Sequence, residues 1–302
     1  MVAPGQPKAG TQALRFSILH PQEVTVATGQ MRPYNSHRGM MAAARGDDSM
    51  TAGMDGKVAL VTGGGAGIGR ASALAFARHG ARVAVADMDM AGGHETVRLV
   101  KEVGGDGAFV LCDVSESAEV EALVRQVAEA NGRLDYAHNN AGIAGDIVLT
   151  ADCTEENWDR TMNINLRGIW LCMRYEIRQM LVQGGGAIVN ASSTAGLVGS
   201  RRSSAYAAAS HGVIGLTKSA ALEYAQAGIR INAICPGPVR TPMMERIMGG
   251  NAQIESQMIA RIPLGRMATP EEIAEVVVWL CSDGAAFVTG HALCADGGVV
   301  AS

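Results

Sequence analysis

The chain is 302 residues long, with 48% hydrophobic residues, 18% charged residues and a formal net charge of −4. This composition is typical of a soluble globular protein, and the length suffices for one large α/β domain. The slight negative charge gives no reason to expect a nucleic acid or an anionic membrane as a partner. No apolar run approaches the roughly 20 residues that span a bilayer.

The six cysteines form no CxxC pair, and none stands at metal-ligand spacing from a histidine. We therefore expect no metal site and reduced thiols, as in a cytoplasmic protein. Residues 1–54 differ from the rest, because they carry five basic residues against three acidic ones and show no hydrophobic periodicity. They contain no secretory apolar region, and we expect a disordered or dispensable N-terminal extension.

From Lys57 onward, short apolar runs alternate with segments of helical spacing. Strands are expected at 57–63, 82–87, 108–114, 134–142, 187–193, 229–237 and 292–296. Helices are expected near 71–80, 91–103, 117–131, 155–183, 205–226 and 270–282, with a loop-rich segment at 238–268. Strands that are apolar throughout and alternate with helices predict an α/β fold, a doubly wound (Rossmann) parallel sheet in a single domain over residues 55–302.

The stretch TGGGAGIG at 62–69 follows the first strand and opens a helix. Gly63 permits a tight turn, Gly67 lets backbone approach a pyrophosphate, and Gly69 lets the helix pack closely on the strand. The helix N-terminus then offers N–H donors to phosphates. This context predicts a dinucleotide site.

Asp87 ends the second strand, eighteen residues after Gly69. A carboxylate there accepts hydrogen bonds from an adenosine ribose and repels a 2′-phosphate. Neither Gly65, Ala66 nor Met88 offers a cation for such a phosphate, so we expect NAD rather than NADP. The alternative is a structural role for Asp87 at the strand end.

The spacing TGxxxGxG, together with NNAG (139–142), NASS (190–193), a tyrosine thirteen residues after Ser193, PGPVRT (236–241) and VTGHALCADGG (288–298), resembles the short-chain dehydrogenase/reductase family. The resemblance covers residues 55–302, and within the family the chain resembles above all the classical NAD-preferring branch. It implies oxidation of secondary alcohols, including alicyclic diols and sugars, or reduction of the matching ketones. It also implies a homotetramer that pairs the two long helices at 155–183 and 205–226.

The resemblance further implies which residues contact the cofactor. Asp113 and Val114 are expected to flank the adenine. The glycine loop is expected to contact the pyrophosphate of the cofactor. The other residues expected to contact the cofactor are Ile68, Asn140, Ala141, Gly142, Tyr206, Pro236, Gly237, Val239 and Thr241.

Hydride transfer at an alcohol carbon needs a group that moves the hydroxyl proton, and Tyr206 fits if its pKa, about 10 unperturbed, is drawn toward neutral pH. Ser193 would hold the substrate oxygen, and the resemblance assigns to Asn165 a water that links the site to solvent. Each residue has a structural alternative. Tyr206 would pack in an interface, Ser193 would form a strand-end turn, and Asn165 would bend a helix.

In the family a lysine follows the tyrosine by four residues, one turn along the same helix face, and here that position is Ser210. Lys218 stands twelve residues from Tyr206, about 18 Å along a helix. His211 is rotated off the tyrosine's face, and Arg201 and Arg202 are expected to be solvated. The tyrosine therefore lacks a neighbouring cation.

We thus expect an NAD-dependent oxidoreductase of a small alcohol or ketone, slowed by Ser210. The alternative is an NAD(H)-binding protein without turnover that serves as scaffold, subunit or redox sensor. The methionine-rich segment 238–268 is expected to form a flexible apolar lid over the substrate, or instead a helix packed on the core.

Overall fold

The computed structural model describes residues 53–301, so the extension predicted at 1–54 lies outside the described residues except for Gly53 and Met54, and Ser302 lies outside them too. Met54, which the prediction placed in the extension, is only 2% exposed and belongs to the hydrophobic core. Its backbone N–H donates to the carbonyl of His79 at 2.7 Å. The domain therefore includes Met54 and begins slightly earlier than predicted.

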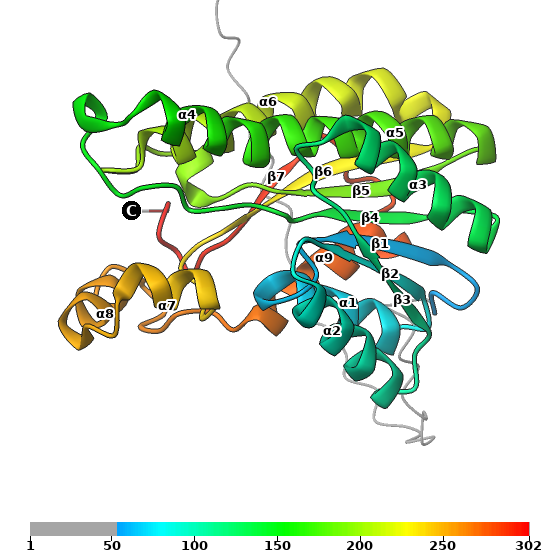
Figure 1. Cartoon of the computed structure of the whole chain (residues 1–302), viewed down its shortest axis with the longest axis horizontal. Coiled ribbons are helices and arrows are strands. Elements are labelled where there is room, and N and C mark those ends of the chain that lie inside the picture. The colour runs from blue at the N-terminus through cyan, green and yellow to red at the C-terminus, as the bar shows by residue number, and fades with distance from the viewer. Residues whose placement is uncertain (1–52, 302) are drawn as a thin grey trace, which may run out of the picture. The chain divides into compact units, whose positions relative to one another are not determined.

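The described residues form a seven-stranded sheet in the order β3-β2-β1-β4-β5-β6-β7, and every strand pair is parallel. This confirms the predicted doubly wound sheet (Figure 1). The order reverses between β1 and β4, and ligands of such sheets bind beyond the carboxyl ends of the strands at that point. The strands are β1 (Val58–Thr62), β2 (Arg82–Asp87), β3 (Gly107–Leu111), β4 (Tyr136–Asn139), β5 (Gly186–Ala191), β6 (Ile229–Pro236) and β7 (Ala292–Ala295).

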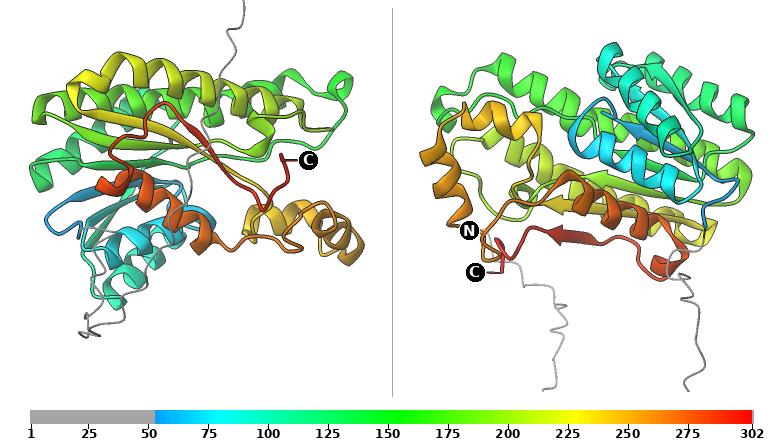
Figure 2. Two further views of the ribbon diagram at one scale, coloured as in Figure 1. Left: turned by 180° about the vertical axis from the view of Figure 1, so that it is seen from behind. Right: turned by 90° about the horizontal axis from the view of Figure 1, so that it is seen from below.

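Helices cover both faces of the sheet, as the apolar strands require. One layer holds α1 (Gly67–Arg78), α2 (Met90–Glu102) and α9 (Pro270–Cys281). The other holds α3 (Ser117–Asn131), α4 (Glu155–Met162), α5 (Ile169–Gln183) and α6 (Ser204–Tyr224). Figures 1 and 2 show the two layers on opposite sides of the strands. Each layer encloses its own cluster of buried side chains, so the domain has a core on each face.

Two stretches differ from the sequence prediction. The helix expected over 155–183 contains a π-helical segment, η2 (Asn163–Gly168), between α4 and α5. The segment expected to be loop-rich contains two short helices, α7 (Pro242–Met248) and α8 (Ala252–Ile259). Thr241 caps α7, and Asn251 caps α8, because each side chain accepts a backbone N–H at the helix start. These caps supply the start signals that define the helices.

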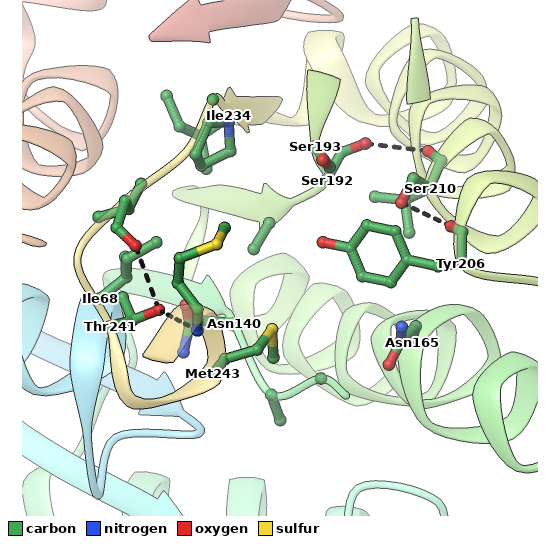
Figure 3. Close-up of a pocket in the computed structure, with 18 residues that line it drawn as sticks. Ile68, Asn140, Asn165, Ser192, Ser193, Tyr206, Ser210, Ile234, Thr241 and Met243 are labelled. Carbon is green, nitrogen blue, oxygen red and sulfur yellow. Dashed lines mark hydrogen bonds between the residues drawn. The ribbon is translucent and has the colours of Figure 1, made fainter. Parts of the chain in front are cut away.

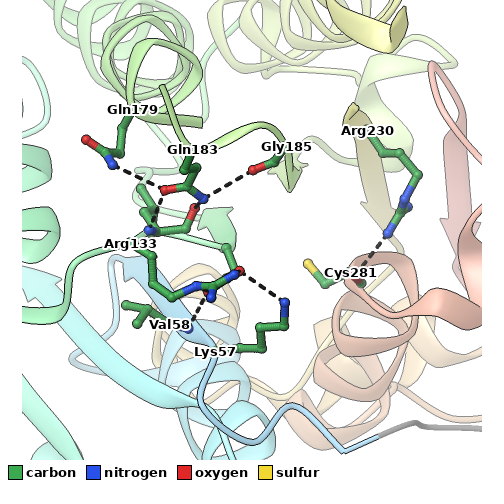
Figure 4. A network of polar contacts seen from close by, with 10 residues as sticks. Lys57, Val58, Arg133, Gln179, Gln183, Gly185, Arg230 and Cys281 are labelled. Carbon is green, nitrogen blue, oxygen red and sulfur yellow. Dashed lines mark hydrogen bonds and ion pairs between the residues drawn. The ribbon is translucent and has the colours of Figure 1, made fainter. Parts of the chain in front are cut away.

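A polar network fixes the amino ends of the strands, at the edge of the sheet away from their carboxyl ends (Figure 4). The Asp135 carboxylate accepts the Val58 N–H at 3.0 Å and pairs with Lys57 at 3.4 Å. Arg230, near the start of β6, donates to the carbonyl of Cys281 at 2.9 Å and so caps the carboxyl end of α9. The opposite edge of the sheet carries none of these contacts and holds the cavities described next. None of the helices within residues 53–301 combines the length and apolarity of a membrane span.

Candidate active site

Two adjoining cavities lie at the carboxyl ends of the strands. We call the first the tyrosine cavity, because Tyr206 and Ser193 line it, and the second the aspartate cavity, because Asp87 lines it. Six residues line both: Ile68, Asn140, Ala141, Gly142, Thr241 and Met243. The two cavities therefore form one continuous groove across the point where the strand order reverses.

The glycine loop leaves no room for side chains. Gly63 has φ 62°, and a Cβ added to it would lie 2.7 Å from the Cα of Ala141. A Cβ on Gly69 would lie 2.0 Å from the carbonyl oxygen of Gly63, and Gly69 lines neither cavity. The structure therefore gives Gly69 a packing role between helix and strand, and Gly63 a turn role, as the sequence indicated.

The N-terminus of α1 is free to receive an anion. Within residues 53–301, no side chain accepts the N–H groups of its first turn, and that turn carries no acidic residue. Helix α1 starts at Gly67, which lines the aspartate cavity. Unpaired N–H donors at a helix N-terminus bind phosphates, so the loop fits a dinucleotide pyrophosphate.

Asp87 is held in place by backbone. Its two carboxylate oxygens accept the N–H groups of Gly65 and Asp89, each at 2.8 Å. Asp113 and Val114, the residues expected beside the adenine, line the same cavity. The structure thus brings the predicted adenosine-side residues to one end of the groove.

Sequence reasoning missed Arg246, which also lines the aspartate cavity. For the cofactor phosphates it considered cations only in the glycine loop and beside Asp87, and it described 238–268 as a loop-rich segment. Arg246 follows Pro242 by four residues and therefore shares its side of α7, but the sequence holds no signal that brings this side of the helix to the cavity.

Tyr206 lies in the first turn of α6, and its ring projects into the tyrosine cavity between Asn165 on one side and Ser192 and Ser193 on the other (Figure 3). Burial raises the pKa of the Tyr206 phenol, and a hydrogen bond with Ser193 offsets part of that rise. No cation contributes to the pKa shift, and no charged side chain lines the tyrosine cavity among the described residues. The phenol therefore stays protonated to higher pH than an exposed tyrosine.

Ser210 lies one turn after Tyr206, and it is buried beside the cavity that both residues line. Its hydroxyl donates to the Tyr206 carbonyl at 2.8 Å, and its own carbonyl accepts the Ser192 hydroxyl at 2.9 Å. Its side chain is thus turned back along its own helix. It supplies no charge to the phenol.

The other cations considered from sequence lie elsewhere. Lys218 and Arg201 are exposed and line neither cavity. Arg202, also exposed, donates to the carbonyl of Ile147 at 3.4 Å. His211 is exposed, with Nδ1 2.9 Å from the carbonyl oxygen of Ala207. The expectation that none of these reaches Tyr206 agrees with their placement.

Asn165 sits in the π-helical segment, where one extra residue in the turn aims it at the cavity. Both ends of its amide bond the backbone of Ile143, accepting its N–H and donating to its carbonyl at 2.8 Å each. The amide therefore anchors the chain after NNAG to the helix. Pro236, Gly237 and Val239 line the same cavity from the end of β6 and the loop beyond it.

The methionine-rich segment divides into two groups. Met243 and Met244 line the tyrosine cavity, as a lid would. Met248 instead belongs to a small buried cluster with Ile262 and Met267. Part of the segment therefore faces the cavity and part is packed inside, and its role as a substrate lid stays a prediction.

Comparisons with known proteins show the family to which the chain belongs. A family model described as "Enoyl-(Acyl carrier protein) reductase" matches residues 63–300. The chain is 44% identical over 249 residues to 2,5-dichloro-2,5-cyclohexadiene-1,4-diol dehydrogenase of Sphingobium indicum, covering 82% of this chain and 98% of that one. It is 42% identical over 241 residues to cyclohexanol dehydrogenase of Acinetobacter sp., covering 80% and 94%. The crystal structure of levodione reductase has a TM-score of 0.81 at 39% identity, covering 82% and 99%.

The chain therefore belongs to the short-chain dehydrogenase/reductase family and is an oxidoreductase of that family. Proteins of this family use nicotinamide cofactors, and similar solved structures include complexes with NADPH and with NADP. The relatives are named as dehydrogenases, so the comparisons do not favour the alternative of a binding protein without turnover.

Proposed function

We propose that this protein transfers a hydride between NAD(H) and the carbinol carbon of a neutral alicyclic secondary alcohol, or the matching ketone. The observation that carries the proposal is the continuous groove with Asp87 at one end and Tyr206 and Ser193 at the other. The names of the cyclohexanol and cyclohexadiene-diol relatives support the substrate class. The absence of charged side chains among the described lining of the tyrosine cavity favours an uncharged substrate.

The cofactor would lie along this groove. Asp87 would bind the adenosine ribose, and its negative charge favours NAD over NADP. The N-terminus of α1 would bind the pyrophosphate. The nicotinamide end would contact Pro236, Gly237, Val239 and Thr241, which line the tyrosine cavity.

The bound nicotinamide supplies the hydride acceptor or donor. Ser193 holds the substrate oxygen by a hydrogen bond, and Tyr206 gives or takes the hydroxyl proton. Because burial raises the phenol pKa and Ser210 brings no cation, little phenolate is present near neutral pH to accept the alcohol proton. We therefore propose slow alcohol oxidation, reduced by about two to four orders of magnitude, the usual contribution of general acid–base catalysis.

We also propose a cytoplasmic homotetramer, on the strength of the family resemblance. Trp158 on α4 and Trp170 on α5 are each 40% exposed, and Leu222 on α6 is 86% exposed. Such side chains suit a face buried between subunits. Light scattering of the purified protein measures the mass and tests this proposal.

The test of function compares wild type with Tyr206→Phe. Wild type is expected to bind NADH, seen by fluorescence, and to oxidise cyclohexanol at alkaline pH. The variant is expected to keep NADH binding and to lose turnover, since the ring remains and only the hydroxyl is removed. Absence of NADH binding by wild type, or full activity of Tyr206→Phe, would contradict the proposal.

A further inference from the structure

One arginine in the groove lacks a partner. Arg246 lines the aspartate cavity, is exposed, and makes no ion pair or hydrogen bond within residues 53–301. Two arginines nearby are occupied. Arg70 donates to the carbonyl of Gly65 and to the Thr96 hydroxyl, and Arg240 pairs with Glu255 at 2.8 Å. Arg246 is therefore the free guanidinium among the described residues that line the groove.

The start of α7 lies against the start of α1. A Cβ on Gly67 would lie 3.2 Å from the Thr241 side chain and 3.7 Å from Pro242. Pro242, Met243 and Arg246 all line the aspartate cavity and share one side of α7. Arg246 thus lies on the helix that faces the N-terminus of α1 across this cavity.

A pyrophosphate bound in the aspartate cavity would need positive charge to balance its own. Its charged lining residues within 53–301 are Asp87, Asp113 and Arg246. A pyrophosphate carries two negative charges and would share the cavity with these two carboxylates. The α1 N-terminus offers only the partial charge of its dipole, whereas a guanidinium offers a full charge and a fork of donors.

We infer that the Arg246 guanidinium binds the pyrophosphate of the dinucleotide from the side opposite α1. This inference rests on the proposed function, because it requires a dinucleotide in the groove. Arg246 shares α7 with Met243 and Met244, which line the tyrosine cavity. A pyrophosphate held by Arg246 would therefore also fix the helix that forms one wall of the substrate end.

The experiment measures binding rather than turnover. Arg246→Gln is compared with Arg261→Gln, which removes another exposed arginine that lies just beyond α8 and lines neither cavity. Dissociation constants of NADH and NADPH come from fluorescence, and those of ADP and adenosine from competition with NADH. Thermal melting shows that each variant is folded.

Arg246→Gln is expected to weaken the binding of NADH, NADPH and ADP by about tenfold, which corresponds to the loss of one charged hydrogen bond. The dissociation constant of adenosine should not change. The substitution should also lessen the salt dependence of NADH binding. Arg261→Gln should match wild type. A loss of affinity confined to NADPH would show that Arg246 binds the 2′-phosphate. An equal loss of affinity for adenosine would indicate general distortion of the cavity. Either result would overturn the inference. Wild type that binds no NADH would instead refute the proposed function.

Discussion

Restoring a positive charge next to Tyr206 is expected to accelerate alcohol oxidation. The change is Ser210→Lys, at a buried position one helical turn after Tyr206 in the same cavity. Within residues 53–301, the Ser210 hydroxyl bonds only the Tyr206 carbonyl, so its removal costs a single local hydrogen bond there. A lysine there has space to extend into the cavity, which Ser210 already lines.

The size of the effect follows from the geometry of the helix. Positions four apart are separated by about 6 Å along the axis, and a long side chain brings its charge to about 4–6 Å from the phenol oxygen. At an effective dielectric of about 20, a unit charge at that distance stabilises the phenolate by about 3–4 kcal/mol, or two to three pKa units. Since oxidation needs the phenolate as proton acceptor, the rate near pH 7 should rise by about a hundredfold to a thousandfold.

The assay measures the absorbance of the NADH that forms as cyclohexanol is oxidised, from about pH 6 to about pH 10. Wild-type oxidation should increase toward alkaline pH, because burial raises the Tyr206 pKa and the phenolate fraction grows as the pH approaches that value. Ser210→Lys should shift the profile to lower pH. Ser210→Met fills similar space without charge and should behave like wild type. The reasoning is refuted if wild type is already fast at neutral pH with the same profile as Ser210→Lys, or if methionine accelerates the reaction equally.

Three further changes test other parts of the structure. Gly69→Ala, whose Cβ would lie 2.0 Å from the Gly63 carbonyl oxygen, should lower the free energy of unfolding in urea by about 3 kcal/mol or more, whereas Gly199→Ala meets no atom within 4 Å and should change little. Asp87→Asn should raise NADPH affinity relative to NADH by about tenfold in fluorescence titrations, and an unchanged ratio would contradict its proposed role. Burial raises the pKa of Glu176 from 4.5 to about 8, so the folded state holds the proton more tightly than the unfolded state does. The free energy of unfolding should therefore fall by about 1.4 kcal/mol for each unit by which the pH rises between these two values, and Glu176→Gln should flatten this slope.

Sequence predicted those parts of the structure that depend on local signals. The strands are short runs of apolar residues closed by turns, and their order along the chain suffices for a parallel sheet. The glycines of the loop are required by backbone contacts such as that between Gly69 and Gly63, so their spacing is visible in the sequence. Asp87 was proposed from its distance to the glycine loop, and Tyr206 and Ser193 from the motifs of the family resemblance; their roles stay predictions. The structure brings all three to one groove.

Other features depend on contacts between distant segments, which spacing does not reveal. The π-helical turn that presents Asn165 is stabilised by the backbone of Ile143, twenty-two residues earlier. Helices α7 and α8 are short, and an isolated helix of that length is unstable without packing. The buried cluster around Met248 supplies that packing. Arg246 was missed for the same reason, because its place in the groove depends on α7 lying against Gly67.

In the proposed function, the adenosine and pyrophosphate of the cofactor are bound by residues other than Tyr206 and Ser210, so a change at position 210 need not affect both cofactor binding and proton transfer. Asp87 and the glycine loop are fixed by backbone contacts that do not involve α6. Ser210 acts on the phenol only through the charge that it fails to provide. A protonated Tyr206 is the form required to reduce a ketone, and the raised pKa keeps that form present at neutral pH. The raised pKa also makes that form a weaker proton donor, and because an enzyme does not change the equilibrium constant, the serine should slow kcat/KM for oxidation and for reduction by the same factor at a given pH. Reduction of cyclohexanone by NADH near pH 7 should therefore accelerate in Ser210→Lys together with oxidation, and acceleration of oxidation alone would show that position 210 acts through the relative affinity for NAD and NADH rather than through the charge of the phenol.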